Sequence, residues 1–145
     1  FDPAGNGVPN GYPPLNGLRI LIVDDDDQTL EILRVVFRKC RSDVKTAATA
    51  AEAFQIAREW HPDVIVSDIG MPGEDGYAFM RKIRNWEKEK NAGRPSIKAV
   101  ALTAYAHADD RQRALDAGFH LHIPKPVEPL DLAALIQTLA AENAD

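Results

Sequence analysis

The sequence predicts an α/β fold, a doubly wound sheet of five parallel strands alternating with five helices, and three observations carry this prediction. Five short apolar runs recur along the chain, and stretches with helical periodicity lie between them. The composition gives no sign of a second domain. A chain of 145 residues is long enough for one core. Alternating strand and helix patterns favour a parallel sheet with helices on both faces.

The first 17 residues differ in composition, with four glycines, four prolines and three asparagines. Such a segment buries too little surface to offset its ordering entropy. We therefore expect a flexible linker or arm over 1–17 and one domain over 18–145. The chain begins with Phe1 and shows no leader or membrane-spanning run, which favours a processed or excised piece.

The expected strands are the apolar runs. They are Ile20–Val23, Val44–Ala47, Val64–Ser67, Ala99–Leu102 and Leu121–Ile123. The third and fourth are almost continuously aliphatic, which is typical of strands that are buried on both faces.

Apolar residues at steps of three and four predict the helices. The clearest stripes are Leu30, Leu33, Phe37 and Cys40, then Phe79, Ile83 and Trp86, and finally Leu132, Leu135, Ile136 and Leu139. Thr49 followed by Glu52 is a capping box that opens the second helix. Pro129 suits the first turn of the last helix, where a missing N–H costs nothing.

Polar residues end four of the five strands, and ligands of such sheets bind beyond the carboxyl ends of the strands. These residues are Asp24 and Asp25 after the first strand, Asp68 after the third, Thr103 after the fourth, and the Lys125–Pro126 step after the fifth. Three carboxylates, a hydroxyl and an ammonium group should therefore converge on one edge.

Three carboxylates in one cleft repel one another unless a cation intervenes or one takes a proton. With oxygen ligands and no adjacent His or Cys, the favoured cation is Mg²⁺, ahead of Mn²⁺ or Ca²⁺. Lys125 and Thr103 suit the oxygens of a phosphoryl group, and an aspartate can act as a nucleophile that forms an acyl phosphate. The residues predict a metal-assisted phosphoryl-transfer site.

Four segments in this order resemble the receiver domain of two-component response regulators. They are Ile20–Asp25 (ILIVDD), Ser67–Gly76 (SDIGMPGEDG), Ala101–Ala104 (ALTA) and Lys125–Pro126. The resemblance covers the chain from about Leu18 to Ala140. It implies a flavodoxin-like (βα)5 fold with strand order 2-1-3-4-5 and a phosphoacceptor function in a phosphorelay.

The resemblance also implies a role for each site residue. Asp68 corresponds to the phosphoacceptor and a metal ligand, Asp25 binds Mg²⁺ directly, and Asp24 acts mainly through metal-bound water. The backbone carbonyl of Gly70 is the other protein ligand.

Lys125 and Thr103 correspond to the residues that contact the phosphoryl group, and the bond before Pro126 is expected to be cis. Thr103 is also a switch residue. The aromatic switch partner of most receivers is replaced by His122, and a bulky Tyr105 lies where it would shield the phosphoryl group from water.

The run Gly118–Pro129 (GFHLHIPKPVEP) is most similar to receivers at the C-terminus of hybrid sensor histidine kinases, and the chain stops just after the last helix. We therefore expect a hybrid-kinase receiver, with a free-standing single-domain response regulator as the alternative. Its partner would be a histidine kinase or a histidine phosphotransfer domain, and the face formed by helix four, strand five and helix five allows a homodimer.

Charge and cysteine content limit the expected binding partners and the expected cellular compartment. With 17 basic and 22 acidic residues the formal charge is −5, which argues against direct nucleic-acid binding. A lone Cys40 suits a reducing, cytoplasmic compartment. The parent protein can be membrane-anchored, but we expect this segment itself to make no membrane contact.

Two other function classes stay open at this point. Asp25-x-Asp27-x-Thr29 satisfies the DxDxT pattern of haloacid dehalogenase phosphatases, with Asp25 as nucleophile, but this reading leaves Asp68 unexplained. A receiver-like module that is never phosphorylated and acts only by binding is the other, and the intact acids, Thr103 and Lys125 argue against it. As a receiver, the chain would catalyse only its own phosphorylation and dephosphorylation.

Overall fold

The computed structural model describes residues 8–9, 11–90, 94–104 and 108–142. Ten elements follow one another in strict alternation. They are β1 (Arg19–Val23), α1 (Asp27–Lys39), β2 (Asp43–Ala47), α2 (Ala50–Trp60), β3 (Val64–Asp68), α3 (Gly76–Lys90), β4 (Lys98–Thr103), α4 (Ala108–Ala117), β5 (Leu121–Pro124) and α5 (Pro129–Ala141). All neighbouring strands pair in parallel, in the order β2-β1-β3-β4-β5.

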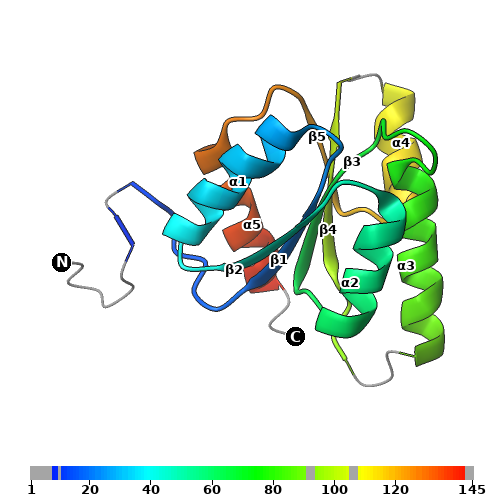
Figure 1. Cartoon of the computed structure of the whole chain (residues 1–145), viewed down its shortest axis with the longest axis horizontal. Helices are drawn as coiled ribbons and strands as arrows, with labels where there is room; N and C mark the ends of the chain where they lie inside the picture. The colour runs from blue at the N-terminus through cyan, green and yellow to red at the C-terminus, as the bar shows by residue number, and fades with distance from the viewer. Residues whose placement is uncertain (1–7, 10, 91–93, 105–107, 143–145) are drawn as a thin grey trace.

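The fold prediction is confirmed, including the strand order. Helices α1 and α5 cover one face of the sheet, and α2, α3 and α4 cover the other (Figure 1). The expected strands are all present, and each observed strand is one or two residues longer than its apolar run. The added residues are mostly polar, such as Asp43 and Lys98, because backbone pairing continues beyond the apolar run.

The central strands explain why their sequences are almost wholly apolar. Successive side chains of a strand point to opposite faces. In β3, Val64 and Val66 pack on the α1–α5 side while Ile65 packs on the α2–α4 side, and all three are fully buried. With helices on both faces, neither side of β3 meets solvent.

Side-chain caps begin α2 at the predicted Thr49 and α1 at Asp26. The Glu52 N–H donates to Thr49 Oγ1 at 3.2 Å, which is one of the two hydrogen bonds of the predicted capping box, while Glu52 Oε1 accepts from the Ala48 N–H at 2.9 Å, one residue before the cap. Asp26 caps α1 in the same way and accepts from the Gln28 N–H at 3.2 Å. These caps fix where the loops after β1 and β2 turn back into helices.

The segment expected to be an arm is packed at its C-terminal end. Leu15 is 1% exposed and belongs to the core between the sheet and the α1–α5 layer. Its N–H donates to the Cys40 carbonyl at 2.7 Å, and the Gly17 N–H donates to the Arg41 carbonyl at 3.1 Å. The ordered unit therefore begins before Leu18, because Leu15, together with the half-buried Tyr12 and these backbone hydrogen bonds, holds the segment against the core.

Cys40 is fully buried, and burial raises the pKa of its thiol, so it packs as an apolar side chain. Within the described part of the chain, no helix combines the length and the apolar character needed to cross a bilayer.

Candidate functional site

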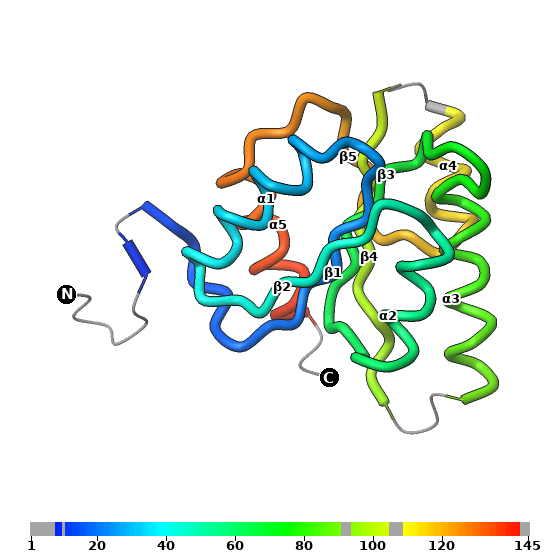
Figure 2. The backbone as a smooth tube through the Cα atoms, in the orientation of Figure 1, coloured from blue at the N-terminus to red at the C-terminus, as the bar shows by residue number. Residues whose placement is uncertain are grey.

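The carboxyl edge of the sheet brings the predicted residues together. Figure 2 shows the loops that follow β1, β3 and β5 on the same upper side of the molecule. Asp24 directly follows β1, and Asp68 ends β3, the strand that pairs with β1 in the sheet. Thr103 ends β4, and Lys125 directly follows β5. Asp24, Asp68 and Thr103 are all buried, so this edge is a polar cluster largely withdrawn from water.

Lys125 links the two buried aspartates. Its Nζ lies 2.9 Å from Asp24 Oδ2 and 3.3 Å from Asp68 Oδ1. Its backbone N–H donates to the Thr103 carbonyl at 2.7 Å, and the Lys125–Pro126 peptide bond is cis. Burial by itself would lower the pKa of Lys125, but the hydrogen bond and the charge of Asp24, joined by Asp68, raise it overall. Lys125 is therefore an ammonium ion at neutral pH.

The Asp68 carboxyl group is less well satisfied. Burial, and next the charge of Asp24, raise its pKa, and only part of this effect is offset by Lys125 and by a hydrogen bond from the Gly70 backbone. Asp24 by contrast has both oxygens engaged, Oδ2 by Lys125 and Oδ1 by the Asp26 N–H at 2.9 Å. Of the two buried acids, Asp68 has the greater need for further positive charge.

Asp24, Asp25 and Asp68 form a group that fits a divalent cation. Each offers a carboxylate oxygen, and these oxygens lie within 4.8 Å of one another. Hard cations prefer such oxygen ligands, and a single nearby ammonium does not balance three carboxylates. Asp25 is exposed while the other two are buried, so the group opens to solvent on one side. Waters and a phosphoryl oxygen can complete a coordination shell there.

The loop after β3 depends on two glycines. A hollow of about 500 Å³ is lined by Asp68, Gly70, Thr103 and Lys125 among others. Gly70 has open space where a Cβ would be, so its backbone is the relevant part of this residue. Gly76 is different, because a Cβ there would collide with the backbone oxygen of Asp68 and lie 2.9 Å from the Ile69 Cα. Its N–H donates to the Ile69 carbonyl at 2.9 Å, which closes the loop tightly.

The far side of this hollow holds residues that the sequence reasoning missed. Tyr77 of α3 donates a 3.4 Å hydrogen bond to the backbone carbonyl of Asp110 in α4, and Arg113 lies 4.4 Å from the centre of the Tyr77 ring. Burial, and then the charge of Asp110, raise the pKa of Tyr77. These residues meet only because α3 and α4 pack side by side, and no local motif predicts that.

Of the two further predicted switch residues, His122 and Tyr105, the structure describes only His122. His122 lies in β5 opposite Ala101, which places it on the α2–α4 face of the sheet. Its Nε2 is buried and has no hydrogen-bond partner in the described part of the chain. Tyr105 lies outside the described residues. Both roles stay predictions.

The phosphatase pattern does not form a site. Asp27 begins α1 and is not one of the clustered carboxylates. Thr29 Oγ1 donates to Asp26 Oδ2 at 2.7 Å, so that hydroxyl serves the helix cap. The DxDxT reading of Asp25 is therefore not supported by the positions of its other two members.

Comparison with known proteins gives a consistent result. The chain matches the sequence model of the response regulator receiver domain over residues 20–137. It is 39% identical over 118 residues to the "uncharacterized 14.6 kDa protein in sodA1 3'region" of Leptolyngbya boryana, covering 81% of this chain and 86% of that protein. It is 37% identical over 129 residues to hybrid signal transduction histidine kinase D of Dictyostelium discoideum, covering 86% of this chain but 8% of the kinase.

Solved structures agree. A chain in the co-crystal structure of the Saccharomyces cerevisiae phosphotransfer protein Ypd1 with the receiver domain of Ssk1 matches with a TM-score of 0.83 at 27% identity, covering 90% of this chain and 93% of that one. A CheY-like response regulator receiver domain protein from Methanospirillum hungatei matches with a TM-score of 0.77 at 30% identity, covering 88% and 97%.

Proposed function

The chain belongs to the response regulator receiver domain family, and from that premise we propose that Asp68 is the residue that accepts the phosphoryl group. The supporting observation is the position of Lys125, whose Nζ lies 2.9 Å from Asp24 and 3.3 Å from Asp68. A fixed ammonium beside the acceptor stabilises the negative charge of a phosphoryl group in transfer.

The donor is a phosphohistidine of a histidine kinase or a histidine phosphotransfer domain. An Asp68 carboxylate oxygen attacks the phosphorus in line, so that an O–P bond forms while the N–P bond to the donor imidazole breaks. The imidazole nitrogen keeps the electron pair of that bond and takes a proton from water. Lys125 pairs with one phosphoryl oxygen, and the hydroxyl of Thr103 donates to another.

Asp24, Asp25, Asp68 and the Gly70 carbonyl would hold Mg²⁺, which supplies positive charge to the phosphoryl oxygens when it is bound. The chain's own residues prepare that place. The Asp26 N–H and Lys125 fix both oxygens of Asp24, and the Gly70 N–H orients Asp68. Asp68 is thereby presented towards the hollow.

The output is a change of protein binding. Phosphorylated Asp68 draws Thr103 towards it, and the face formed by α4, β5 and α5 rearranges, where a homodimer can also form. His122 takes part because its buried Nε2 has no partner in the described structure and can gain one. Tyr105, beyond the described residues, would slow hydrolysis by shielding the phosphoryl group.

We place the chain within a larger protein. Hybrid kinase D and the sensor protein GacS of Pseudomonas syringae pv. syringae, 30% identical over 126 residues, both contain a matching segment, but the chain spans only 8% and 14% of their lengths. A receiver domain of a cytoplasmic hybrid-kinase module, joined through its N-terminal segment, fits these matches. A free-standing regulator is the second candidate, favoured by the Leptolyngbya boryana relative, of which the chain covers 86%.

The test is direct phosphorylation of the whole chain. Incubation with Mg²⁺ and acetyl phosphate should add one phosphoryl group, seen in the intact mass. Asp68→Asn should abolish the addition. Asp27→Asn, which removes a neighbouring acid outside the carboxylate group, should leave it intact.

Two results would contradict the proposal. If Asp68→Asn still gains a phosphoryl group and peptide mapping finds it on Asp25, the phosphatase reading is correct. If the unaltered chain gains none, and none is transferred from a phosphorylated histidine phosphotransfer domain, the chain is a binding-only module.

A further inference from the structure

A second feature lies at the edge of the sheet formed by β2, away from the carboxylate cluster. A groove of about 560 Å³ there is lined by residues of α1, of β2 and of the end of α2. We call it the basic groove and define it by Arg38, Arg41, Val44, Lys45 and Trp60. Nothing in the proposed phosphoryl transfer uses these residues.

The charge of the basic groove is opposite to that of the chain. Arg38 and Lys45 are exposed, and neither forms an ion pair with any residue that the structure describes. Lys45 Nζ lies 5.2 Å and Arg19 Cζ 5.9 Å from the centre of the Trp60 ring, so cations gather around one half-buried aromatic side chain. Asp43 is the one acidic residue among those lining the groove. A positive surface on a chain of formal charge −5 attracts a negatively charged partner selectively.

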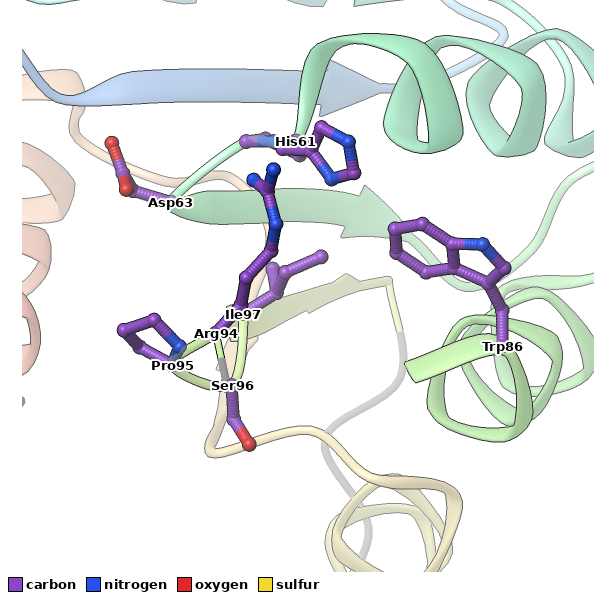
Figure 3. A pocket seen from close by; sticks show the side chains of 8 residues that line it. His61, Asp63, Trp86, Arg94, Pro95, Ser96 and Ile97 are labelled. Atoms are coloured by element: carbon purple, nitrogen blue, oxygen red, sulfur yellow. The ribbon is translucent and has the colours of Figure 1, made fainter. Parts of the chain in front are cut away.

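Further charged residues, both basic and acidic, lie at the amino ends of the strands. Burial first, and then Arg94 and Arg19, lower the pKa of His61, the residue after Trp60. Figure 3 shows the guanidinium of Arg94 lying between Asp63 and His61 in a pocket of about 90 Å³. This pocket is too small for an extended chain, and Asp63 lines it together with Arg94, so the docking site is confined to the basic groove.

The backbone of β2 supplies the second part of the argument. β2 stands at the end of the sheet and, among the strands that the structure describes, pairs with β1 alone. The Asp43 N–H donates to Leu18 and the Ala47 carbonyl accepts from Asp24, so both groups face β1. Backbone direction alternates along a strand, and the N–H and C=O groups of Val44 and Thr46 therefore face away from β1, with Val44 lining the groove.

We infer that the basic groove binds an extended acidic polypeptide segment, which adds to the sheet beside β2. Alternate side chains of such a segment would point to the Arg38 side and to the Lys45–Trp60 side, since those residues flank the strand on opposite faces. The outward N–H and C=O groups select a polypeptide. A nucleic acid could meet the cations but has no backbone amides to pair with β2.

The test is fluorescence anisotropy of a labelled peptide of alternating Glu and Val, titrated with the whole chain at low and high salt. Arg38→Glu and Lys45→Glu should each weaken binding about tenfold. Arg111→Glu is the matched control, an equal charge reversal on exposed α4 at the far side of the molecule, and should leave binding unchanged. N-methylation of alternate peptide amides should weaken binding by a similar factor, because it blocks strand pairing.

Trp60 gives a local readout. In the Trp86→Phe variant it is the one remaining tryptophan of the chain, and its emission should shift on peptide binding. Asp68→Asn should bind the peptide normally, which separates this inference from the proposed function. The inference is overturned if the peptide does not bind, if Arg111→Glu weakens it equally, or if the N-methylated peptide binds as well. Preference for single-stranded nucleic acid or anionic lipid vesicles over the peptide would also overturn it.

Discussion

Two polar clusters lie at opposite ends of the sheet, and they are built on different principles. At the amino ends of β4 and β5, Arg84 of α3 pairs with Glu87 at 2.7 Å and donates to the Gly118 carbonyl at 3.1 and 2.7 Å. The other oxygen of Glu87 accepts from the Ile97 N–H at 2.8 Å. Nearly every strong donor and acceptor of this cluster has a partner. At the carboxyl ends, three carboxylates lie close together, and Lys125 pairs with two of them, Asp24 and Asp68.

The difference separates a structural task from a functional one. A buried ion pair contributes to stability only when its remaining hydrogen-bonding atoms are satisfied, and the Arg84 cluster meets this condition. The Asp68 cluster leaves charge unbalanced and leaves one acid with a raised pKa. Such unbalanced charge is typical of sites that await a ligand. Loss of the Arg84 side chain should therefore lower stability and leave phosphorylation intact, whereas loss of the Asp68 charge should abolish phosphorylation without lowering stability.

The largest effect is expected from Gly76→Ala, which breaks the carboxyl-end cluster through its backbone. The new Cβ would collide with the Asp68 carbonyl oxygen, and backbone atoms cannot move aside as a flexible side chain can. We expect a loss of about 3 kcal/mol in the free energy of unfolding and greatly reduced phosphorylation. Urea unfolding and phosphodonor uptake measure both.

Gly70→Ala is the matched stability control for that variant, because its Cβ would meet open space. It should change the free energy of unfolding by less than about 1 kcal/mol. Equal losses in the two variants would show that the close approach at Gly76 does not govern this loop.

The next effect is expected from Arg84→Ala, which breaks the amino-end cluster. It leaves Glu87, whose side chain is 10% exposed, without its cation and removes both donors to Gly118. We expect a loss of about 2 kcal/mol in unfolding free energy. Phosphodonor uptake by the folded protein should stay within about twofold of the wild type, because the carboxylate cluster is untouched.

Arg34→Ala provides a control of the same i,i+3 geometry. Arg34 pairs with Glu31 at 2.6 Å, but the two side chains are 35% and 61% exposed. Urea unfolding should show almost no change for this variant, since exposed pairs contribute little. A loss as large as that of Arg84→Ala would mean that burial is not what distinguishes the two pairs.

A smaller effect is expected from Gly118→Ala, which strains the amino-end cluster without removing it. Gly118 has φ of +116°, and a Cβ there would lie 2.7 Å from Arg84 Cγ. The arginine side chain can shift, so we expect a loss of about 1–2 kcal/mol in unfolding free energy. Combining Gly118→Ala with Arg84→Ala should cost less than the sum of the single losses, because the collision is gone. Strict additivity in that double-mutant cycle would contradict the contact.

The sequence could predict one of these clusters and not the other. Asp24, Asp68 and Lys125 each stand directly at a strand end, and parallel strands bring such positions together without further information. Arg84 and Glu87 have the same spacing as the exposed pair Glu31 and Arg34, so sequence alone cannot say which pair is buried. The decisive partner, Gly118, is 34 residues away from Arg84.

The fold could be predicted almost completely for a related reason. Apolar runs mark buried strands, and their order along the chain limits the possible topologies. What the runs could not mark were polar strand ends such as Asp43 and Lys98, where pairing continues without burial. Leu15 was missed because a single apolar side chain does not alter the composition of a polar segment.

The smallest effect reverses the usual sign, since Asp68→Asn should stabilise the protein at neutral pH without divalent cations. The pKa of Asp68 is raised in the folded state, chiefly by burial and next by Asp24, so the native state holds this proton more tightly than the unfolded chain. Stability therefore falls as the pH rises from the unfolded pKa of the carboxyl group to its raised folded pKa. Removing the charge should recover about 1 kcal/mol near pH 7 and nothing at a pH below both pKa values.

Urea unfolding of the wild type and of Asp68→Asn across this pH range, with and without Mg²⁺, tests whether the Asp68 cluster is electrostatically unbalanced. Mg²⁺ should stabilise the wild type more than Asp68→Asn, because the variant has lost one of the three clustered carboxylates. Glu59→Gln, on the exposed surface of α2, should change unfolding free energy by less than about 0.5 kcal/mol throughout. If Asp68→Asn is instead less stable at neutral pH without Mg²⁺, the Asp68 carboxylate is as well satisfied as Glu87. The two ends of the sheet would then not differ in electrostatic balance.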